Sequence, residues 1–160
     1  ATSMSAWIPS LDVAAPAPVP TQHPTPDGAL VDPVGTGLDI EVVAVIDGTE
    51  FCRTSTRHLY WTHRQQLAHL TSNGAGVRTG DLFATGTVSG PTDAERACLL
   101  EATDRGATPI RLADGRERTW LADGDTVTLT GRTRGADGAV IELGPVVGTV
   151  IPTRQPGGER

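Results

Sequence analysis

The chain has 160 residues, of which 38% are hydrophobic and 4% aromatic, and its formal net charge at pH 7 is −6. This length suits one domain with its own apolar core, and we assign residues 1–152 to that domain. The 19 glycines and 12 prolines favour short strands and turns and exclude a coiled coil. No apolar run approaches the roughly 20 residues that cross a bilayer, so we expect no membrane contact. Cys52 and Cys98 are too few for a disulfide framework and are typical of reduced thiols in a cytoplasmic protein.

Charge is distributed unevenly along the chain. Residues 1–50 carry seven acidic residues and no arginine, whereas residues 51–80 carry four arginines and no acid, and lysine is absent throughout. A net acidic chain with one short basic stretch is a poor nucleic-acid binder. The basic stretch fits an acidic surface or a carboxylate ligand, and the alternative is a solvated helix face.

The first half of the chain predicts a long connection, a hairpin and one helix. Residues 16–33 are rich in proline and predict an extended surface segment. Residues 38–47 and 49–54 predict two strands joined by an Asp-Gly hairpin turn. A helix follows to about Asn73, with its N-cap among residues 54–56 and Gly74 as its C-terminal cap.

The second half predicts mostly short strands. Asp-Gly turns every 8 to 14 residues indicate an antiparallel body. After Gly80, we expect a helical turn at 93–97, a disordered tail at 153–160, and strands at 82–88, 98–103, 108–112, 117–121, 126–133, 139–143 and 146–151. The predicted fold is therefore mainly β (α+β): an antiparallel β-roll or barrel-like body with one main helix.

Motifs for familiar hydrolases and metal sites are incomplete. In residues 86–90, GTVSG, the serine stands one place too late for the G-x-S-x-G nucleophile elbow, and all four histidines precede residue 70. His58 and His69 are eleven residues apart without the glutamate of a zinc-binding helix, which favours surface histidines on one helix face at a subunit or domain contact. Glu101 stands in an apolar stretch, where a carboxylate is either a paired structural acid or a functional one.

Several motifs match one family in order. Residues 80–91, GDLFATGTVSGP, resemble the GDLL-x-SGT-I-SGP signature of the fumarylacetoacetate hydrolase (fumarylacetoacetase) family. The runs at 60–69, 121–131 and 5–12 resemble its YWT-x-x-QQL-x-H, LLDGD-x-V and SPWVVP-x-D motifs. The resemblance covers nearly the whole chain, to Pro152, and matches only the C-terminal half of the longer family protein. We therefore expect a piece of such a protein.

The resemblance implies a chemistry and places three residues in it. It implies hydrolysis of the carbon–carbon bond of fumarylacetoacetate to fumarate and acetoacetate, the last step of tyrosine catabolism, by a cytoplasmic homodimer that uses Mg²⁺ and Ca²⁺. The family's water-activating histidine and acidic metal ligands align before residue 1, so we expect no complete metal site here and no activity from this chain alone. Glu101 aligns with the carboxylate that orients the histidine, Thr87 with a substrate-contacting threonine, and Thr2 with a residue near the magnesium.

Two alternatives stay open. One is another acylpyruvate or diketone hydrolase of the same superfamily, acting on a related small diketo acid. The other is a half-length, non-catalytic subunit that serves as a scaffold or in dimerisation.

Overall fold

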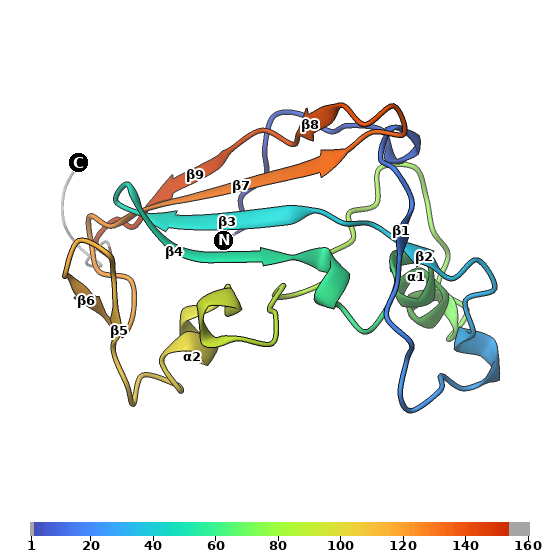
Figure 1. Cartoon of the computed structure of the whole chain (residues 1–160), viewed down its shortest axis with the longest axis horizontal. Coiled ribbons are helices and arrows are strands. Elements are labelled where there is room, and N and C mark those ends of the chain that lie inside the picture. Colours follow the sequence, from blue (N-terminus) through green and yellow to red (C-terminus); the bar gives the residue numbers. More distant parts are fainter. Residues whose placement is uncertain (1, 154–160) are drawn as a thin grey trace.

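A five-stranded antiparallel sheet organises the chain, and it confirms the predicted mainly β architecture (Figure 1). The structure is a computed structural model and describes residues 2–153, so most of the predicted disordered tail lies outside the described residues. The strand order is β4-β3-β7-β8, with β9 also paired to β7. The strands are β3 (Glu41–Ile46), β4 (Thr49–Ser55), β7 (Thr126–Arg134), β8 (Val140–Glu142) and β9 (Val146–Thr149).

The predicted hairpin turns set the register of the sheet. Asp47 and Gly48 both have positive φ, 47° and 81°, which matches the right-handed twist of the strands that they join, β3 and β4. Asp47 also accepts a hydrogen bond from the Thr126 amide at 2.7 Å, so the turn reaches the neighbouring strand β7. The predicted second hairpin forms only two short strands, β5 (Ile110–Arg111) and β6 (Glu117–Arg118).

One face of the sheet carries a small apolar core. Ala44, Ile46 and Cys52 are buried on β3 and β4, and Leu112 is buried at the β5–β6 hairpin. The 3-10 turn η4 (Asp93–Glu95) packs on β4, and α2 (Leu99–Ala102) lies beyond that strand (Figure 1). Burial raises the pKa of the Cys52 thiol to about 11, so this thiol is neutral at physiological pH.

The opposite face of the sheet is charged, and its ion pairs join arginines of the basic stretch to acidic residues from the first 50 positions. Arg53 pairs with Glu41 and Glu50, each at 2.6 Å. Arg57 pairs with Asp39 at 2.8 Å at the end of β4. Arg53 and Arg57 of the basic stretch 51–80 therefore pair with acids of residues 1–50 within the chain. From the sequence, an acidic surface, a carboxylate ligand and a solvated helix face were all open for this stretch.

The main helix, α1, spans His63–Thr71 and starts later than predicted. Its N-cap is Thr62, where a complete capping box joins Thr62 and Gln65: each side chain accepts from the other residue's backbone amide, at 3.2 and 2.9 Å. Of the residues predicted as caps, Thr54 and Ser55 are buried in β4, because the strand continues through them. Ser55 still caps a helical turn, but that turn is 3-10 and not α1: its hydroxyl accepts from the Arg57 amide at 3.1 Å. His58 lies in the 3-10 turn η3 (Thr56–His58), so the prediction that it shares a helix face with His69 was wrong.

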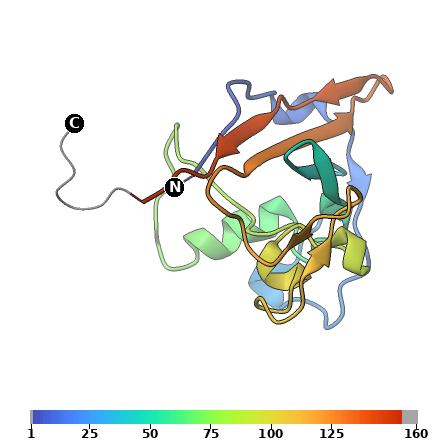
Figure 2. The same cartoon turned by 90° about the vertical axis from the view of Figure 1, so that its left-hand side faces the viewer.

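Two predicted strands are absent from the structure. Residues 82–88 form neither helix nor strand, because Gly80 and Gly86 adopt positive φ (97° and 79°) and the segment has no strand to pair with among residues 2–153. Figure 2 shows the connection after α1 looping away from the sheet. Residues 98–103 form the short helix α2 instead of a strand, and the Thr103 hydroxyl closes it by donating to the Leu99 carbonyl at 2.6 Å. The expected turn at 93–97 is present as η4.

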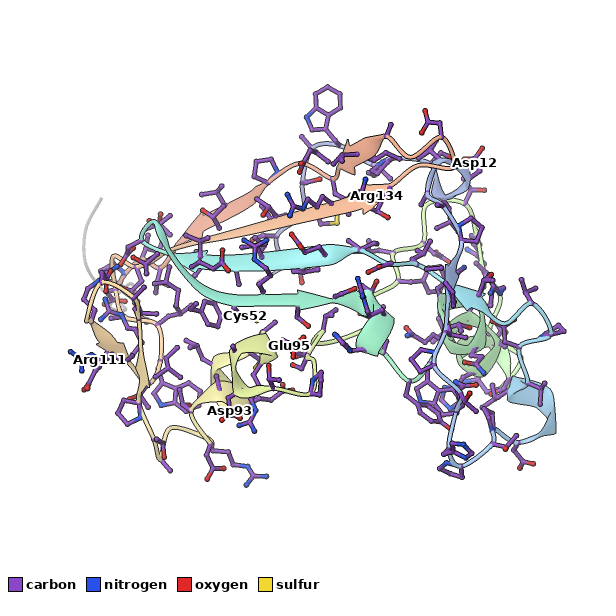
Figure 3. The ribbon with its side chains drawn as sticks, in the orientation of Figure 1. Asp12, Cys52, Asp93, Glu95, Arg111 and Arg134 are labelled. Atoms are coloured by element: carbon purple, nitrogen blue, oxygen red, sulfur yellow. The ribbon has the colours of Figure 1, made fainter. Side chains whose placement is uncertain are left out.

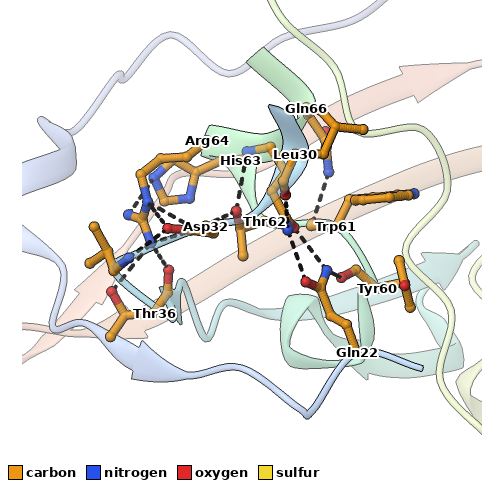
Figure 4. A network of polar contacts seen from close by, with 12 residues as sticks. Gln22, Leu30, Asp32, Thr36, Tyr60, Trp61, Thr62, His63, Arg64 and Gln66 are labelled. Carbon is orange, nitrogen blue, oxygen red and sulfur yellow. Dashed lines mark hydrogen bonds and ion pairs between the residues drawn. The ribbon is translucent and has the colours of Figure 1, made fainter. Parts of the chain in front are cut away.

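The proline-rich segment is anchored to α1 by polar side chains (Figure 4). Asp32 accepts from Thr62 at 2.7 Å and pairs with Arg64 at 3.0 Å, while Gln65 exchanges two 2.8 Å hydrogen bonds with Gln22. The segment itself contains only two short elements, β1 (Ala17–Pro18) and η2 (Gly28–Leu30). It is preceded by η1 (Leu11–Val13) and followed by β2 (Thr36–Gly37), which pairs with β1. No helix within the described range could span a bilayer.

Large apolar side chains remain exposed over much of the surface. Ile8 is 89% exposed and Leu82 is 68% exposed, and α1 leaves Leu67 and Leu70 exposed on the side that faces residues 82–85. The fully buried apolar core holds only Ala44, Ile46, Cys52 and Leu112 among the described residues. Monomeric proteins rarely leave so much apolar surface uncovered.

We therefore expect the 160-residue chain expressed alone to self-associate. Sedimentation velocity at increasing concentration should show a rising weight-average mass, and Leu67→Glu combined with Leu70→Glu should reduce that rise, because charges oppose burial of the helix face. Arg78→Glu, a charge change at an exposed site of the same region, is the control. A monodisperse monomer that melts cooperatively would contradict this expectation.

Candidate active site

Glu101 is held by a serine from the matched motif. Glu101 lies in the first turn of α2 and is exposed, and its Oε2 accepts a hydrogen bond of 2.5 Å from the hydroxyl of Ser89. Its backbone carbonyl accepts a longer bond, 3.4 Å, from Arg96. One carboxylate oxygen is therefore engaged by the serine, and Oε1 makes no hydrogen bond to any residue from 2 to 153. Such an oxygen can accept a hydrogen bond from a donor that lies outside the described residues.

The backbone around Ser89 is tied to the turn that precedes α2. Ser89 and Arg96 form an isolated antiparallel bridge, and the Gly90 amide donates to the Glu95 carbonyl at 3.0 Å. A Cβ on Gly90 would stand 2.7 Å from the Glu95 carboxyl carbon, so only glycine fits here without a shift. These contacts fold the chain back on itself and bring residue 89 to residue 101.

Glu95 links this turn to the end of β4. Its carboxylate pairs with the His58 imidazole at 3.2 Å and accepts from the Thr92 hydroxyl at 2.6 Å. Figure 3 shows Glu95 on the stretch between β4 and α2. Hydrogen bonds from Thr92, followed by the nearby His58, keep the pKa of Glu95 below its ordinary value. The segment that carries Glu101 is thereby fixed to the sheet.

Thr87 lies close in sequence to the serine that holds this carboxylate, whereas Thr2 lies near the N-terminal end of the chain. Thr87 is exposed and precedes Ser89 by two residues, at most roughly 7 Å along the chain. Thr2 is exposed at the start of the described chain, and its neighbour Ser5 donates to the Leu143 carbonyl, beyond β8, at 3.0 Å. No hydrogen bond within residues 2–153 connects Thr2 with Thr87 or Glu101.

The described residues do not fit a complete magnesium or calcium site. Among residues 2–153, no group of three or more His, Cys, Asp or Glu side chains is placed to hold a metal ion. Hard cations of this kind take six or more oxygen ligands, commonly including carboxylates, and a lone threonine hydroxyl does not supply them. We therefore derive no reaction step through a metal from this chain.

A cavity of about 780 Å³ lies between α1 and the unpaired segment 82–85. Its walls are mainly apolar and include Trp61, Leu67, Leu70, Leu82 and Phe83. His63 and His69 also border the cavity. Burial lowers the pKa of His63, which favours its neutral imidazole at pH 7. The segment that forms one wall continues directly into Thr87 and Ser89.

The resemblance predicted a role for Glu101 but did not predict its hydrogen-bond partner, Ser89. Ser89 entered that reasoning only as a misplaced nucleophile, because the G-x-S-x-G comparison asks about attack on a carbonyl. The signal that could have found it was the S-G-P run itself. A serine followed by glycine and proline marks a turn, and a turn here returns the chain toward the capping box at Thr92.

Comparison with known proteins shows the family of the chain. Residues 1–151 match the family described as fumarylacetoacetate (FAA) hydrolase, C-terminal. The chain is 38% identical to fumarylacetoacetase of Arabidopsis thaliana, 34% identical to that of Homo sapiens and 39% identical to that of Caenorhabditis elegans. These alignments cover 95%, 97% and 95% of the chain, but only 38%, 39% and 38% of the relatives.

The chain belongs to the fumarylacetoacetate hydrolase family, a family of hydrolases. Within it, the relatives compared here are all fumarylacetoacetases, and the chain spans about two fifths of their length. The expected family membership is therefore confirmed.

Proposed function

We propose that this chain acts as the C-terminal part of an enzyme that hydrolyses the carbon–carbon bond of fumarylacetoacetate to fumarate and acetoacetate. The observation that carries the proposal is the Glu101 carboxylate, presented by the Ser89 hydroxyl of the family motif with its second oxygen left open. Identity of 34–39% to fumarylacetoacetases along nearly the whole chain supports the substrate.

The chemistry requires an activated water that attacks a ketone carbonyl. A neutral imidazole removes the proton from that water, and a carboxylate on the other ring nitrogen fixes the tautomer and stabilises the imidazolium that forms. In our proposal, Glu101 Oε1 accepts the N–H of a histidine that lies outside these 160 residues. The Thr87 hydroxyl contacts the substrate, so it binds and orients the diketo acid while Glu101 acts on the base.

The remaining features of the proposal concern the complete protein. We propose that it is a cytoplasmic homodimer. Mg²⁺ or Ca²⁺ would be held largely by residues outside this chain and would supply Lewis-acid chemistry to the complete site. The ligand is a small diketo acid, and the net charge of −6 argues against nucleic acid as a partner.

The test compares the chain alone with the protein from the complete reading frame. We expect no measurable hydrolysis of fumarylacetoacetate by the purified 160 residues, because no histidine among residues 2–153 hydrogen-bonds to the Glu101 carboxylate. The longer protein should hydrolyse fumarylacetoacetate faster than acylpyruvates of similar size. Chelator-sensitive turnover by the 160 residues alone would contradict the division of the site, and a preference for acylpyruvates would favour the related hydrolase instead.

A gene that starts directly before Ala1, with no in-frame sequence upstream, would favour the non-catalytic subunit.

A further inference from the structure

Ser89 is fixed in the site through both its side chain and its backbone. Its hydroxyl donates to Glu101 Oε2, and its backbone is fixed by the bridge to Arg96. Ser89 is half-buried, whereas Glu101 is exposed. The more firmly packed serine therefore holds the exposed carboxylate. Without this hydrogen bond, an exposed glutamate side chain on a four-residue helix would sample several rotamers.

Because Ser89 engages only Oε2, it leaves Oε1 as the open acceptor. A hydroxyl that donates to one oxygen of a carboxylate limits rotation of the whole group. It also satisfies the lone pairs that would otherwise compete for the incoming N–H. Arg96 pairs with Asp93 at 2.7 Å and bonds Glu101 only at its backbone carbonyl, so it does not compete for the carboxylate. The described residues thus provide one donor for the Glu101 carboxylate and leave Oε1 for the histidine.

We infer that Ser89 is a positioning residue that orients the Glu101 carboxylate toward the catalytic histidine. The inference rests on the proposed function, because it gives Ser89 an effect on rate only through Glu101. Ser89 does not touch the substrate in this role, so its loss acts on kcat and leaves KM nearly unchanged.

The test uses the protein from the complete reading frame with fumarylacetoacetate as substrate. Ser89→Ala is expected to lower kcat roughly tenfold, as the loss of one hydrogen bond to a charged group would, with KM within about twofold of wild type. Ser89→Thr keeps the hydroxyl and should recover most of kcat. Ser72→Ala removes another serine hydroxyl, one that bonds the His69 carbonyl on exposed α1, and should leave both constants unchanged.

A double variant separates positioning from a general structural effect. If Ser89 acts through Glu101, adding Ser89→Ala to Glu101→Gln should lower kcat by less than about threefold beyond Glu101→Gln alone. An undiminished tenfold loss in that background, or an equal loss in Ser89→Thr, would overturn the inference. A normal kcat in Ser89→Ala with a low kcat in Glu101→Gln would overturn it while leaving the proposed function intact. A normal kcat in Glu101→Gln would instead remove the function proposed for the site.

Discussion

Replacing Glu101 with glutamine in the protein from the complete reading frame is expected to lower kcat by roughly 10²–10³-fold. Glutamine keeps the shape and can still accept from Ser89, but it loses the charge that stabilises the imidazolium. In serine proteases the analogous loss from the catalytic triad costs about 10⁴ in rate. A water nucleophile depends less on one tautomer, so we expect a smaller loss. Steady-state kinetics with fumarylacetoacetate measures it, and KM should change little, since Glu101 touches the base and not the substrate.

Thr87→Val provides the contrasting variant. It removes one hydroxyl contact to the substrate, worth about 1 kcal/mol, and should raise KM more than it lowers kcat. The two variants thus separate orientation of the base from binding of the substrate. If kcat of Glu101→Gln stays within about threefold of wild type, Glu101 is a structural acid.

Local signals in the sequence predicted the hairpins well. The Asp-Gly pair at 47–48 takes the positive φ values that a tight hairpin requires, and this requirement acts within two residues. The start of α1 was also encoded locally, in the capping box of Thr62 and Gln65, but the threonines and serine at 54–56 offered an equally good signal. Continuation of β4 decided between them, because pairing with β3 buries Thr54 and Ser55.

Signals that depend on distant partners failed. Residues 82–88 are predicted as a strand, yet a strand forms only where another is available to pair with it. Residues 98–103 alternate equally well, but the Thr103 hydroxyl and the α2 backbone bonds select a helix. Glu101 could be placed by alignment with the family, whereas its contact with Ser89 required the fold. That contact depends on α2 turning the carboxylate back toward a bridge between residues 89 and 96.

The anchor between the proline-rich segment and α1 also depends on distant partners, because Asp32 bonds to residues 30 and 32 positions away. The Asp32 side chain is only 4% exposed, while that of Arg64 is 36% exposed. Arg64 also donates to the Thr36 carbonyl. Hydrogen bonds from Arg64 hold the pKa of Asp32 well below its ordinary value, and they outweigh the effect of burial.

Asp32→Ala is expected to reduce the local stability of α1 by about 2 kcal/mol, because it leaves the Arg64 guanidinium and the Thr62 hydroxyl without their buried acceptor. Amide hydrogen exchange measures this loss: the Gln66 amide, bonded to the Thr62 carbonyl at 3.0 Å, should exchange roughly 30-fold faster. Asp123→Ala removes a carboxylate that makes no hydrogen bond within residues 2–153 and should leave the exchange of α1 unchanged.

Acid should remove the difference between wild type and Asp32→Ala. The folded-state pKa of Asp32 is depressed, so its contribution is fully present above the unfolded value of about 3.9 and is lost as the pH falls from there toward the folded value. After correction for intrinsic exchange rates, the difference should be constant from pH 7 to about pH 5 and should narrow below pH 4. A difference that persists undiminished at pH 3, or that is absent at pH 7, would show that the Asp32–Arg64 pair does not hold the proline-rich segment on α1.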